Sequence, residues 1–247
     1  MVDTLAHSGI DFSWTTLDAL LSNESNAASV YLFPDLFQIS TEARAQLHAF
    51  WKAQQATAIW LFAPGYIGES ADVDNISALT GITTSLRDSA KKSGSKFAFS
   101  GTWIEENQDY GIEQTISPTF ESNDEYADPL ARYRDDDSIS AAMKYLEDGW
   151  TSIAIYEPTL TSELLRDLFY IMEIPLDVSV MGRSANPIAY SNSDNILLYS
   201  PEDTVANLEF DTNRDVLNVL DVKQGWTDSR TVKIDLKAGE TVLLNVR

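Results

Sequence analysis

Residues 29–68, SVYLFPDLFQISTEARAQLHAFWKAQQATAIWLFAPGYIG, decide the fold of this chain. They open with Val30-Tyr31-Leu32-Phe33, a β-branched, aromatic and apolar segment that favours a strand and stops at Pro34, which cannot continue a strand ladder. They close with residues 57–62, TAIWLF, which are almost entirely apolar, as is typical of a strand covered on both faces. A segment with helical periodicity separates the two strands.

The intervening helix is predicted over residues 41–53. Ser40 or Thr41 can cap its first turn, and apolar residues recur at helical spacing through Leu47 and Trp51. A strand, a helix and a second strand of these lengths form a βαβ unit, whose two strands run parallel in one sheet. The stretch therefore predicts an α/β fold built on a parallel sheet.

Helix-like and strand-like segments continue to about residue 185. The patterns predict helices over 72–81 and 163–172, and strands over 96–99, 141–145 and 151–156. Residues 105–128 are polar, acidic and interrupted by a glycine and a proline, so they predict mainly loop. We expect residues 1–185 to form one α/β domain.

The C-terminal part of the sequence has a different character. Short strand-like segments separated by turn residues are predicted over 188–190, 196–199, 205–210, 216–222, 232–236 and 241–246. No segment with helical periodicity interrupts them, which is typical of a small antiparallel domain. We expect residues 186–247 to form this second, β-sandwich domain.

Composition excludes several classes of partner. The 38 acidic and 17 basic residues give a net charge of −21 at neutral pH, which disfavours nucleic acid and anionic membrane surfaces. The chain has no cysteine, so disulfides, thiolate metal sites and a cysteine nucleophile are excluded. We expect a soluble chain with no signal peptide or transmembrane segment in the given sequence, and the compartment stays open.

Four stretches carry a resemblance to a known group of proteins. They are VYLFPDL at 30–36, IWLFAPGYI at 59–67, GWTSIAIY at 149–156 and LKAGETVLL at 236–244. With these residues the chain resembles the C-terminal half of bacterial β-galactosidases and related glycosidase-like proteins. In that group a catalytic barrel is followed by a trimerisation domain and a small β-sandwich.

The resemblance implies a flavodoxin-like domain of the class I glutamine-amidotransferase type, modified for assembly. It also implies a homo-oligomer, a trimer in this family, and a parent protein that is a glycoside hydrolase. The family's first strand is missing here, which leaves a sheet edge uncovered near Val30 and predicts self-association of the chain. The barrel with its catalytic glutamates is absent as well, so no catalytic residue, cofactor or metal is carried over.

The loop over residues 63–68 is the strongest candidate binding site. It follows the carboxyl end of a central parallel strand, where open α/β sheets place their ligands, and its glycines permit close backbone approach. The candidate ligand-binding residues are Trp60, Pro64, Gly65, Tyr66 and Trp103, whose aromatic rings are suited to stacking on sugars. The alternative is a Pro-Gly turn that serves the scaffold alone.

Other candidate chemistry rests on acidic loops. Paired carboxylates for glycoside hydrolysis could come from Glu105, Glu106, Asp109 and Glu113. Calcium ligands could come from the run at 135–137 or from Asp124, Glu125 and Asp128, although neither matches the spacing of an EF-hand loop. The alternative for each is a solvated acidic loop.

Nucleophilic and histidine chemistry has little support in the sequence. There is no G-x-S-x-G motif, and amidotransferase chemistry is excluded without a cysteine. His7 lies at the start of the chain, and His48 lies on the predicted helix, where we expect it to face solvent.

Three functional hypotheses follow. The first is a non-catalytic assembly and accessory region of a carbohydrate-active protein, supporting a neighbouring active site. The second is a sugar-binding module that uses the aromatic residues near the 63–68 loop. The third is an independent glycoside hydrolase that uses the acidic loop residues.

Overall fold

The structure is a computed structural model, and it describes most of the chain in two compact units. The described residues are 1–10, 12–22, 24, 27–87, 91–92, 94–97, 108–112, 114–174, 187–191 and 194–247. Unit 1 comprises residues 1–13 and 161–247, and unit 2 comprises residues 14–160. The boundary expected at about residue 185 falls outside the described residues.

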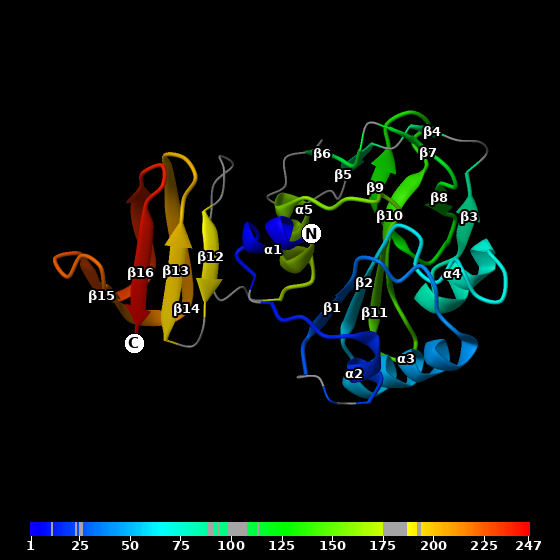
Figure 1. Cartoon of the computed structure of the whole chain (residues 1–247), viewed down its shortest axis with the longest axis horizontal. Helices are drawn as coiled ribbons and strands as arrows, with labels where there is room; N and C mark the ends of the chain where they lie inside the picture. Colours follow the sequence, from blue (N-terminus) through cyan, green and yellow to red (C-terminus); the bar gives the residue numbers. More distant parts are fainter. Residues whose placement is uncertain are drawn as a thin grey trace. The chain divides into compact units, whose positions relative to one another are not determined.

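Unit 2 is built on a mixed sheet (Figure 1). Its main path runs in the order β1 (Val30–Phe33), β2 (Thr57–Leu61), β11 (Thr151–Ile155), β10 (Ile139–Tyr145), β9 (Asp128–Tyr133), β5 (Ser95–Phe97) and β6 (Gln108–Tyr110). Off this path, β3 (Thr84–Leu86) pairs with β8 (Phe120–Ser122), which joins β10, and β4 (Lys91–Lys92) pairs with β7 (Thr115–Ile116).

The predicted βαβ unit is confirmed. Strands β1 and β2 run parallel, with Val30 opposite Thr57, and α3 (Thr41–Gln54) connects them. Ser40 caps that helix, because its side chain accepts a hydrogen bond from the backbone N–H of Ala43 at 3.1 Å. Strand β1 pairs with β2 alone in the described sheet, so its other edge has no strand partner among the described residues.

The predicted flavodoxin-like α/β fold is wrong, because unit 2 is mostly β and its sheet is not a parallel one. Only β1, β2 and β11 run parallel, whereas β10, β9, β5 and β6 are paired antiparallel. The reason lies in residues 83–133, where the sequence suggested irregular structure and loop apart from one strand at 96–99. The described part of this range forms strands of two to six residues, most of them too short for a periodic apolar pattern to reveal.

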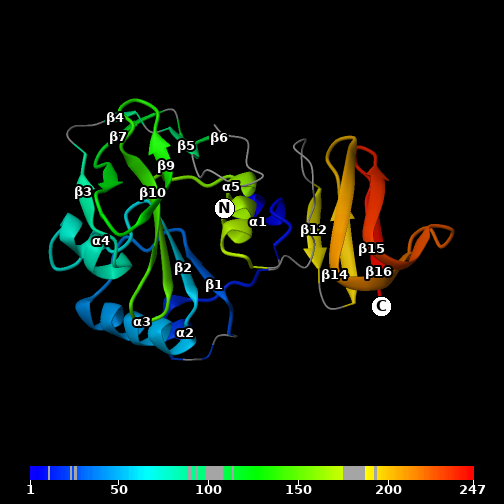
Figure 2. The same cartoon turned by 180° about the vertical axis from the view of Figure 1, so that it is seen from behind.

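Two helices besides α3 are described in unit 2, namely α2 (Leu17–Leu21) and α4 (Val73–Thr80). Figures 1 and 2 both show α2 lying beside α3. One apolar cluster joins these helices to β1 and β2 around Trp51 and Trp60, both fully buried. A second cluster surrounds Phe120 and Tyr156, and it includes Ile76 of α4.

Unit 1 contains an antiparallel sheet, as the sequence predicted. Its order is β12 (Ile188–Ser191), β13 (Asn195–Tyr199), β16 (Thr241–Val246), β14 (Thr204–Asn218) and β15 (Gly225–Leu236). The segments expected at 205–210 and 216–222 belong largely to one long strand, β14. That strand pairs with β15 over most of its length but with β16 only at residues 216–218, so the sheet curls upon itself.

The buried apolar residues of this curled sheet form one cluster. Its buried members are Ala189, Ile196, Leu198, Ala206, Leu208, Phe210, Val216, Val232, Ile234, Leu236, Val242 and Leu244. Two helices, α1 (Val2–Ala6) and α5 (Ser162–Ile171), complete unit 1, and α1 contacts β12. Among the described residues, no helix has the length and apolar character needed to cross a membrane.

Candidate functional site

Buried charged side chains mark the antiparallel side of unit 2. Arg87, Asp124 and Glu157 are 5%, 7% and 0% exposed, although charged residues are rarely buried unless they are paired. Each lies next to one of the short strands that the sequence did not predict or directly after a central strand. They are therefore the first groups to test for chemistry.

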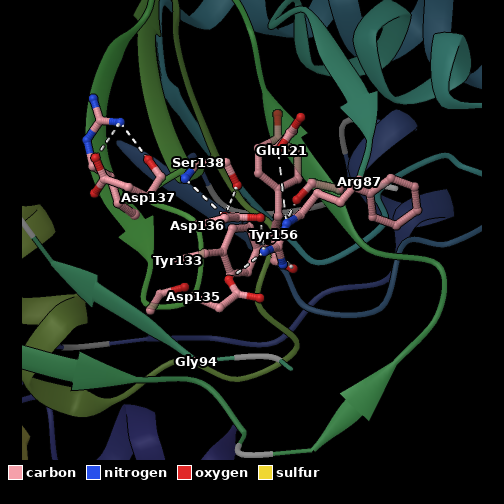
Figure 3. Close-up of polar contacts among 12 residues, drawn as sticks. Arg87, Gly94, Glu121, Tyr133, Asp135, Asp136, Asp137, Ser138 and Tyr156 are labelled. Carbon is pink, nitrogen blue, oxygen red and sulfur yellow. Dashed lines mark hydrogen bonds and ion pairs between the residues drawn. The ribbon is translucent and has the colours of Figure 1, made fainter. Parts of the chain in front are cut away.

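Arg87 directly follows β3, and its side chain is 1% exposed. Its Nη2 donates to Asp135 Oδ1 at 2.7 Å and to Asp136 Oδ2 at 2.8 Å, and the guanidinium lies 3.6 Å from the centre of the Tyr133 ring (Figure 3). Burial lowers the pKa of Arg87, but the hydrogen bonds to Asp136 and Asp135 outweigh it and raise that pKa. The guanidinium is thus a permanent internal cation.

The acidic run at 135–137 is the turn between β9 and β10. Asp136 Oδ1 accepts from the Ser138 backbone N–H at 3.1 Å and from its hydroxyl at 2.7 Å, which fixes the turn. Asp137 has a left-handed φ of 62°, and its side chain is 85% exposed. Two of the three carboxylates that the sequence offered either as calcium ligands or as a solvated loop therefore bind Arg87, and the third is largely exposed, 3.9 Å from Arg132 Nη1.

Asp124, in the second acidic segment, is also paired within the protein. Its Oδ2 accepts from Lys144 Nζ at 2.7 Å and from the Thr83 N–H at 2.8 Å, and Oδ1 accepts from the Tyr126 N–H at 2.9 Å. Burial alone would raise the pKa of Asp124, but the bonds from Lys144 and the two backbone groups outweigh it and lower that pKa. Lys144 supplies the positive charge beside Asp124, so this carboxylate is neither solvated nor free to bind calcium, the two alternatives that the sequence left open.

The described residues contain no cluster of three or more His, Cys, Asp or Glu side chains arranged to hold a metal ion. This finding agrees with the two pairings above. In both acidic segments a basic side chain from a distant strand or strand end already contacts the carboxylates. Neither segment therefore contributes a candidate cation site to the described structure.

Glu157 follows β11 and is completely buried. Its Oε1 accepts from the Gly94 N–H at 2.7 Å and from the Ser95 hydroxyl at 2.6 Å. A Cβ at Gly111 would lie 2.6 Å from Oε2, and Gly111 has a φ of +96°, so only glycine fits beside this carboxylate. Glu157 thereby joins the start of β5 and the end of β6 to the end of β11.

Sequence analysis missed Arg87 and Glu157. The available signal for Glu157 was its position, because a glutamate that continues an apolar strand over 151–156 must lie next to the core. Arg87 carried no comparable signal. Its carboxylate partners are 48 and 49 residues away in the sequence.

Trp60, the first aromatic residue expected to bind sugar, has no exposed surface. Its ring stacks on Phe33 with centroids 4.7 Å apart, and its Nε1 donates to the Ser152 hydroxyl at 3.0 Å. Sugar stacking requires a ring face that is open to the ligand, and here the faces contact the core. Trp103, the other expected tryptophan, lies outside the described residues.

The rest of the 63–68 loop is largely packed against the core. Pro64 and Gly65 are buried, and a Cβ at Gly65 would lie 2.9 Å from Leu79 Cδ2. Gly65 also has a φ of +66°, so packing and backbone conformation both require glycine there. Tyr66 is half-buried, with its ring 5.1 Å from that of Phe120.

Two apolar residues, one in this loop and one in the segment after β1, are exposed. Phe37 is 39% exposed and Ile67 is 42% exposed, and the Ile67 N–H donates to the Phe37 carbonyl at 2.9 Å. We call these two residues and half-buried Tyr66 the strand-end patch, because all three lie in the segments that follow β1 and β2. Its chemistry suits contact with another apolar surface.

The remaining sequence candidates are either engaged or outside the described residues. Glu105, Glu106 and Glu113 lie outside them, whereas Asp109 is exposed in β6 with its Oδ2 3.3 Å from Arg134 Nη1. His48 is half-buried, contrary to the expected solvent position, with Nε2 2.9 Å from the Leu79 carbonyl oxygen.

Comparisons with known proteins give a fold but no family. No family model matches the chain, and no curated protein matches it. Among solved structures, the chain is similar to a β-galactosidase from Bacillus circulans sp. alkalophilus, with a TM-score of 0.63 and 14% identity over 99% of this chain and 36% of that one. It is also similar to a polyextremophilic β-galactosidase from the Antarctic haloarchaeon Halorubrum lacusprofundi, with a TM-score of 0.52 and 9% identity over 89% of this chain and 32% of that one.

These two likenesses show the fold. The chain has a β-galactosidase-related fold and spans about a third of the length of each of those enzymes. The fold likeness agrees with the β-galactosidase resemblance drawn from the sequence. It does not extend to the flavodoxin-like description, which the mixed sheet of unit 2 overturns.

Proposed function

We propose that this chain is a non-catalytic assembly and accessory region of a carbohydrate-active, β-galactosidase-like protein. The observation that carries the proposal is the fold likeness over 99% of this chain to only part of a β-galactosidase. The region supports a neighbouring glycosidase active site by forming a homo-oligomer, for which the family resemblance implies a trimer.

The chemistry of unit 2 is consistent with a supporting role. Its buried charged side chains make internal contacts, because Arg87 binds two aspartates, Asp124 binds Lys144, and Glu157 accepts from the Gly94 N–H. The strand-end patch gives an assembly surface of suitable chemistry, because exposed apolar groups gain free energy when another subunit removes them from water.

A sugar-binding module is the second candidate, favoured by one observation. Phe37 and Tyr66 present aromatic rings at the strand-end patch, where a sugar ring could stack. This candidate and the assembly role make different predictions for thermal unfolding. A bound sugar raises the melting temperature with sugar concentration, whereas an oligomer raises it with protein concentration.

The test is thermal unfolding of the chain over a wide range of protein concentrations, with and without galactose and lactose. The proposal predicts a melting temperature that rises with protein concentration and does not respond to sugar. A sugar-dependent rise at constant protein concentration would support the binding module instead. Hydrolysis of a chromogenic galactoside by the chain alone would support the third hypothesis, a hydrolase.

A matched pair of variants locates the surface. Ile67→Asp places a charge in the strand-end patch, and Tyr145→Asp places the same charge on another exposed apolar residue of unit 2, where 65% of the residue is accessible. If the patch is an assembly surface, Ile67→Asp weakens the dependence on protein concentration and Tyr145→Asp keeps it in full. Equal effects of the two variants would contradict the assignment.

A further inference from the structure

Strand β15 forms one edge of the sheet in unit 1. Among the described residues it pairs with β14 and with no other strand, through a register that includes Ala206 opposite Ile234. The other side of β15 therefore presents backbone N–H and C=O groups along a strand that runs from Gly225 to Leu236. An open edge of this length is a template for pairing with another strand.

The two faces of this edge strand differ sharply over its last five residues. Val232, Ile234 and Leu236 are 0%, 1% and 1% exposed and belong to the apolar core. Lys233 and Asp235 lie between them and are exposed. A strand added at this edge would meet apolar residues on the inner face and charged residues on the outer face.

The charge of β15 sets it apart from the rest of the chain. It carries two acidic and two basic residues, Asp228, Arg230, Lys233 and Asp235, so its charges cancel, whereas the whole chain has a net charge of −21. Natural edge strands are often protected by charges that repel a second copy. Here Lys233 is followed two residues later by Asp235, which allows attraction instead.

Symmetry limits how two copies of β15 can pair. A two-fold axis perpendicular to the sheet makes the strands antiparallel and keeps inner-face residues opposite inner-face residues. A centre at Ile234 places Lys233 opposite the partner's Asp235, and Asp235 opposite the partner's Lys233. Centres at Lys233 or at Asp235 would place like charges directly opposite one another, which is destabilising.

We infer that the β15 edge is a docking surface for a second copy of this chain, paired antiparallel about Ile234. The contact would be made by backbone hydrogen bonds between the two edges and by two Lys–Asp pairs on the outer face, whereas Val232 and Leu236 are already buried within each copy. It goes beyond the proposed function, because it names a surface in unit 1 with two-fold symmetry. A trimer formed through another surface would become a hexamer through this contact.

Charge-exchange variants test the inference by light scattering on the full chain. Lys233→Asp and Asp235→Lys each place like charges opposite one another, and both should halve the mass of the assembly. The exchanged double variant, Lys233→Asp with Asp235→Lys, restores opposite charges and should recover the wild-type mass. Lys223→Asp, an exposed control outside β15, should leave the mass unchanged.

Lys233 and Asp235 are exposed, so we expect the variants to fold, and far-UV circular dichroism checks this. A change in mass then reports on the contact between copies. Single variants that keep the wild-type mass, or a double variant that stays at half the mass, would overturn the inference. A wild-type chain that is monomeric would overturn it as well. A wild-type trimer unaffected by any variant would overturn this contact while leaving the proposed assembly function intact.

Discussion

The two units of this protein differ in how many charged residues they bury. The apolar cluster of unit 1 lies in its sheet, and the fully buried polar residues described in that unit are Ser8, Ser200 and Asn218, none of them charged, although single atoms of Arg166 and Asp167 on α5 are also buried. Unit 2 buries Arg87 and Glu157 beside its apolar clusters, together with Asp124. The buried charges of unit 2 therefore occur together with a sheet that contains very short strands.

That sheet contains strands too short to specify their own pairing. Strands β3, β5, β6 and β8 have three residues each, whereas β14 and β15 of unit 1 have 15 and 12. A wrong register in unit 2 would leave a buried charge without its partner, which costs several kcal/mol. We infer that the charge pairs fix the arrangement of these strands, whereas apolar alternation suffices in unit 1.

The largest expected effect comes from Arg87→Met, which removes the internal cation but keeps much of the side-chain volume. Asp135 and Asp136 would lose their partner, and since they are partly exposed we expect a loss of about 3 kcal/mol in the free energy of unfolding. Urea unfolding followed by tryptophan fluorescence measures it, because Trp51, Trp60 and Trp150 are buried in unit 2.

A variant that also removes the carboxylate charges tests whether the unpaired charges cause this loss of stability. Adding Asp135→Asn and Asp136→Asn to Arg87→Met removes the uncompensated charges and should recover at least half of the lost stability. An Arg87→Met protein as stable as the wild type would show that the pair does not support unit 2.

Lys144→Met should cost about 2 kcal/mol at neutral pH, because it leaves the Asp124 carboxylate buried without its cation. The pKa of Asp124 is lowered from 3.8 in the folded protein, so the unfolded chain binds more protons as the medium becomes acidic. The stabilisation from the ionised Asp124 carboxylate is therefore complete above pH 3.8, and it is lost as pH falls through the pKa of Asp124 in the folded protein.

The difference between Lys144→Met and the wild type should therefore shrink as pH falls below 3.8. Urea unfolding at several pH values measures this difference. Glu125→Gln, at an exposed neighbour of Asp124, is the control that should show no such change. A difference that is constant with pH would contradict the pairing.

A smaller effect of opposite sign is expected in unit 1. Burial raises the pKa of Asp167 on α5 to about 6, and its Oδ2 is buried with no hydrogen-bond partner among the described residues. Because the folded pKa is above the unfolded one, ionisation at neutral pH weakens the fold, and protonation at lower pH restores that stability.

Asp167→Asn should therefore stabilise the protein by about 1 kcal/mol at neutral pH, allowing for partial solvent screening. The gain should disappear as pH falls below 3.8, where the carboxyl group is protonated in both states. Calorimetry at neutral and acid pH measures it. A destabilised Asn variant would show that the Asp167 carboxylate has a stabilising partner.

The smallest effect is expected at the exposed pair of Lys52 and Asp148. Their atoms are 2.7 Å apart, the same distance as in the pair of Lys144 and Asp124, but the side chains are 63% and 57% exposed. Lys52→Ala should change the free energy of unfolding by less than about 0.5 kcal/mol. An effect equal to that of Lys144→Met would show that distance, and not burial, decides the strength of these pairs.

The parts of the fold that could be predicted are those with long apolar patterns. The βαβ unit over 30–61 and the strands of unit 1 follow from periodicity and turn residues, which act locally. In the antiparallel part of unit 2 the patterns predicted segments at 96–99 and 141–145, which match β5 and β10, but not β3, β6, β8 or β9. Strands β3, β5, β6 and β8 are held by partners that are distant in sequence, such as Glu157 and Gly94, 63 residues apart.

The candidate site shows the same limit. Trp60 was expected to be available to a sugar, yet the apolar character of residues 57–62 implied a strand covered on both faces, and the structure buries this ring completely. The run at 135–137 was expected either to bind calcium or to be solvated. Two of its carboxylates bind Arg87, which no local pattern in the sequence connects to them.

The measurement that tests the assembly role most directly is the solution mass of the chain by light scattering, at two protein concentrations, with and without a panel of galactosides. We expect one discrete oligomer whose mass does not respond to sugar. A monomer at both concentrations, with a melting temperature that one galactoside raises, would contradict the assembly role and identify a sugar-binding module.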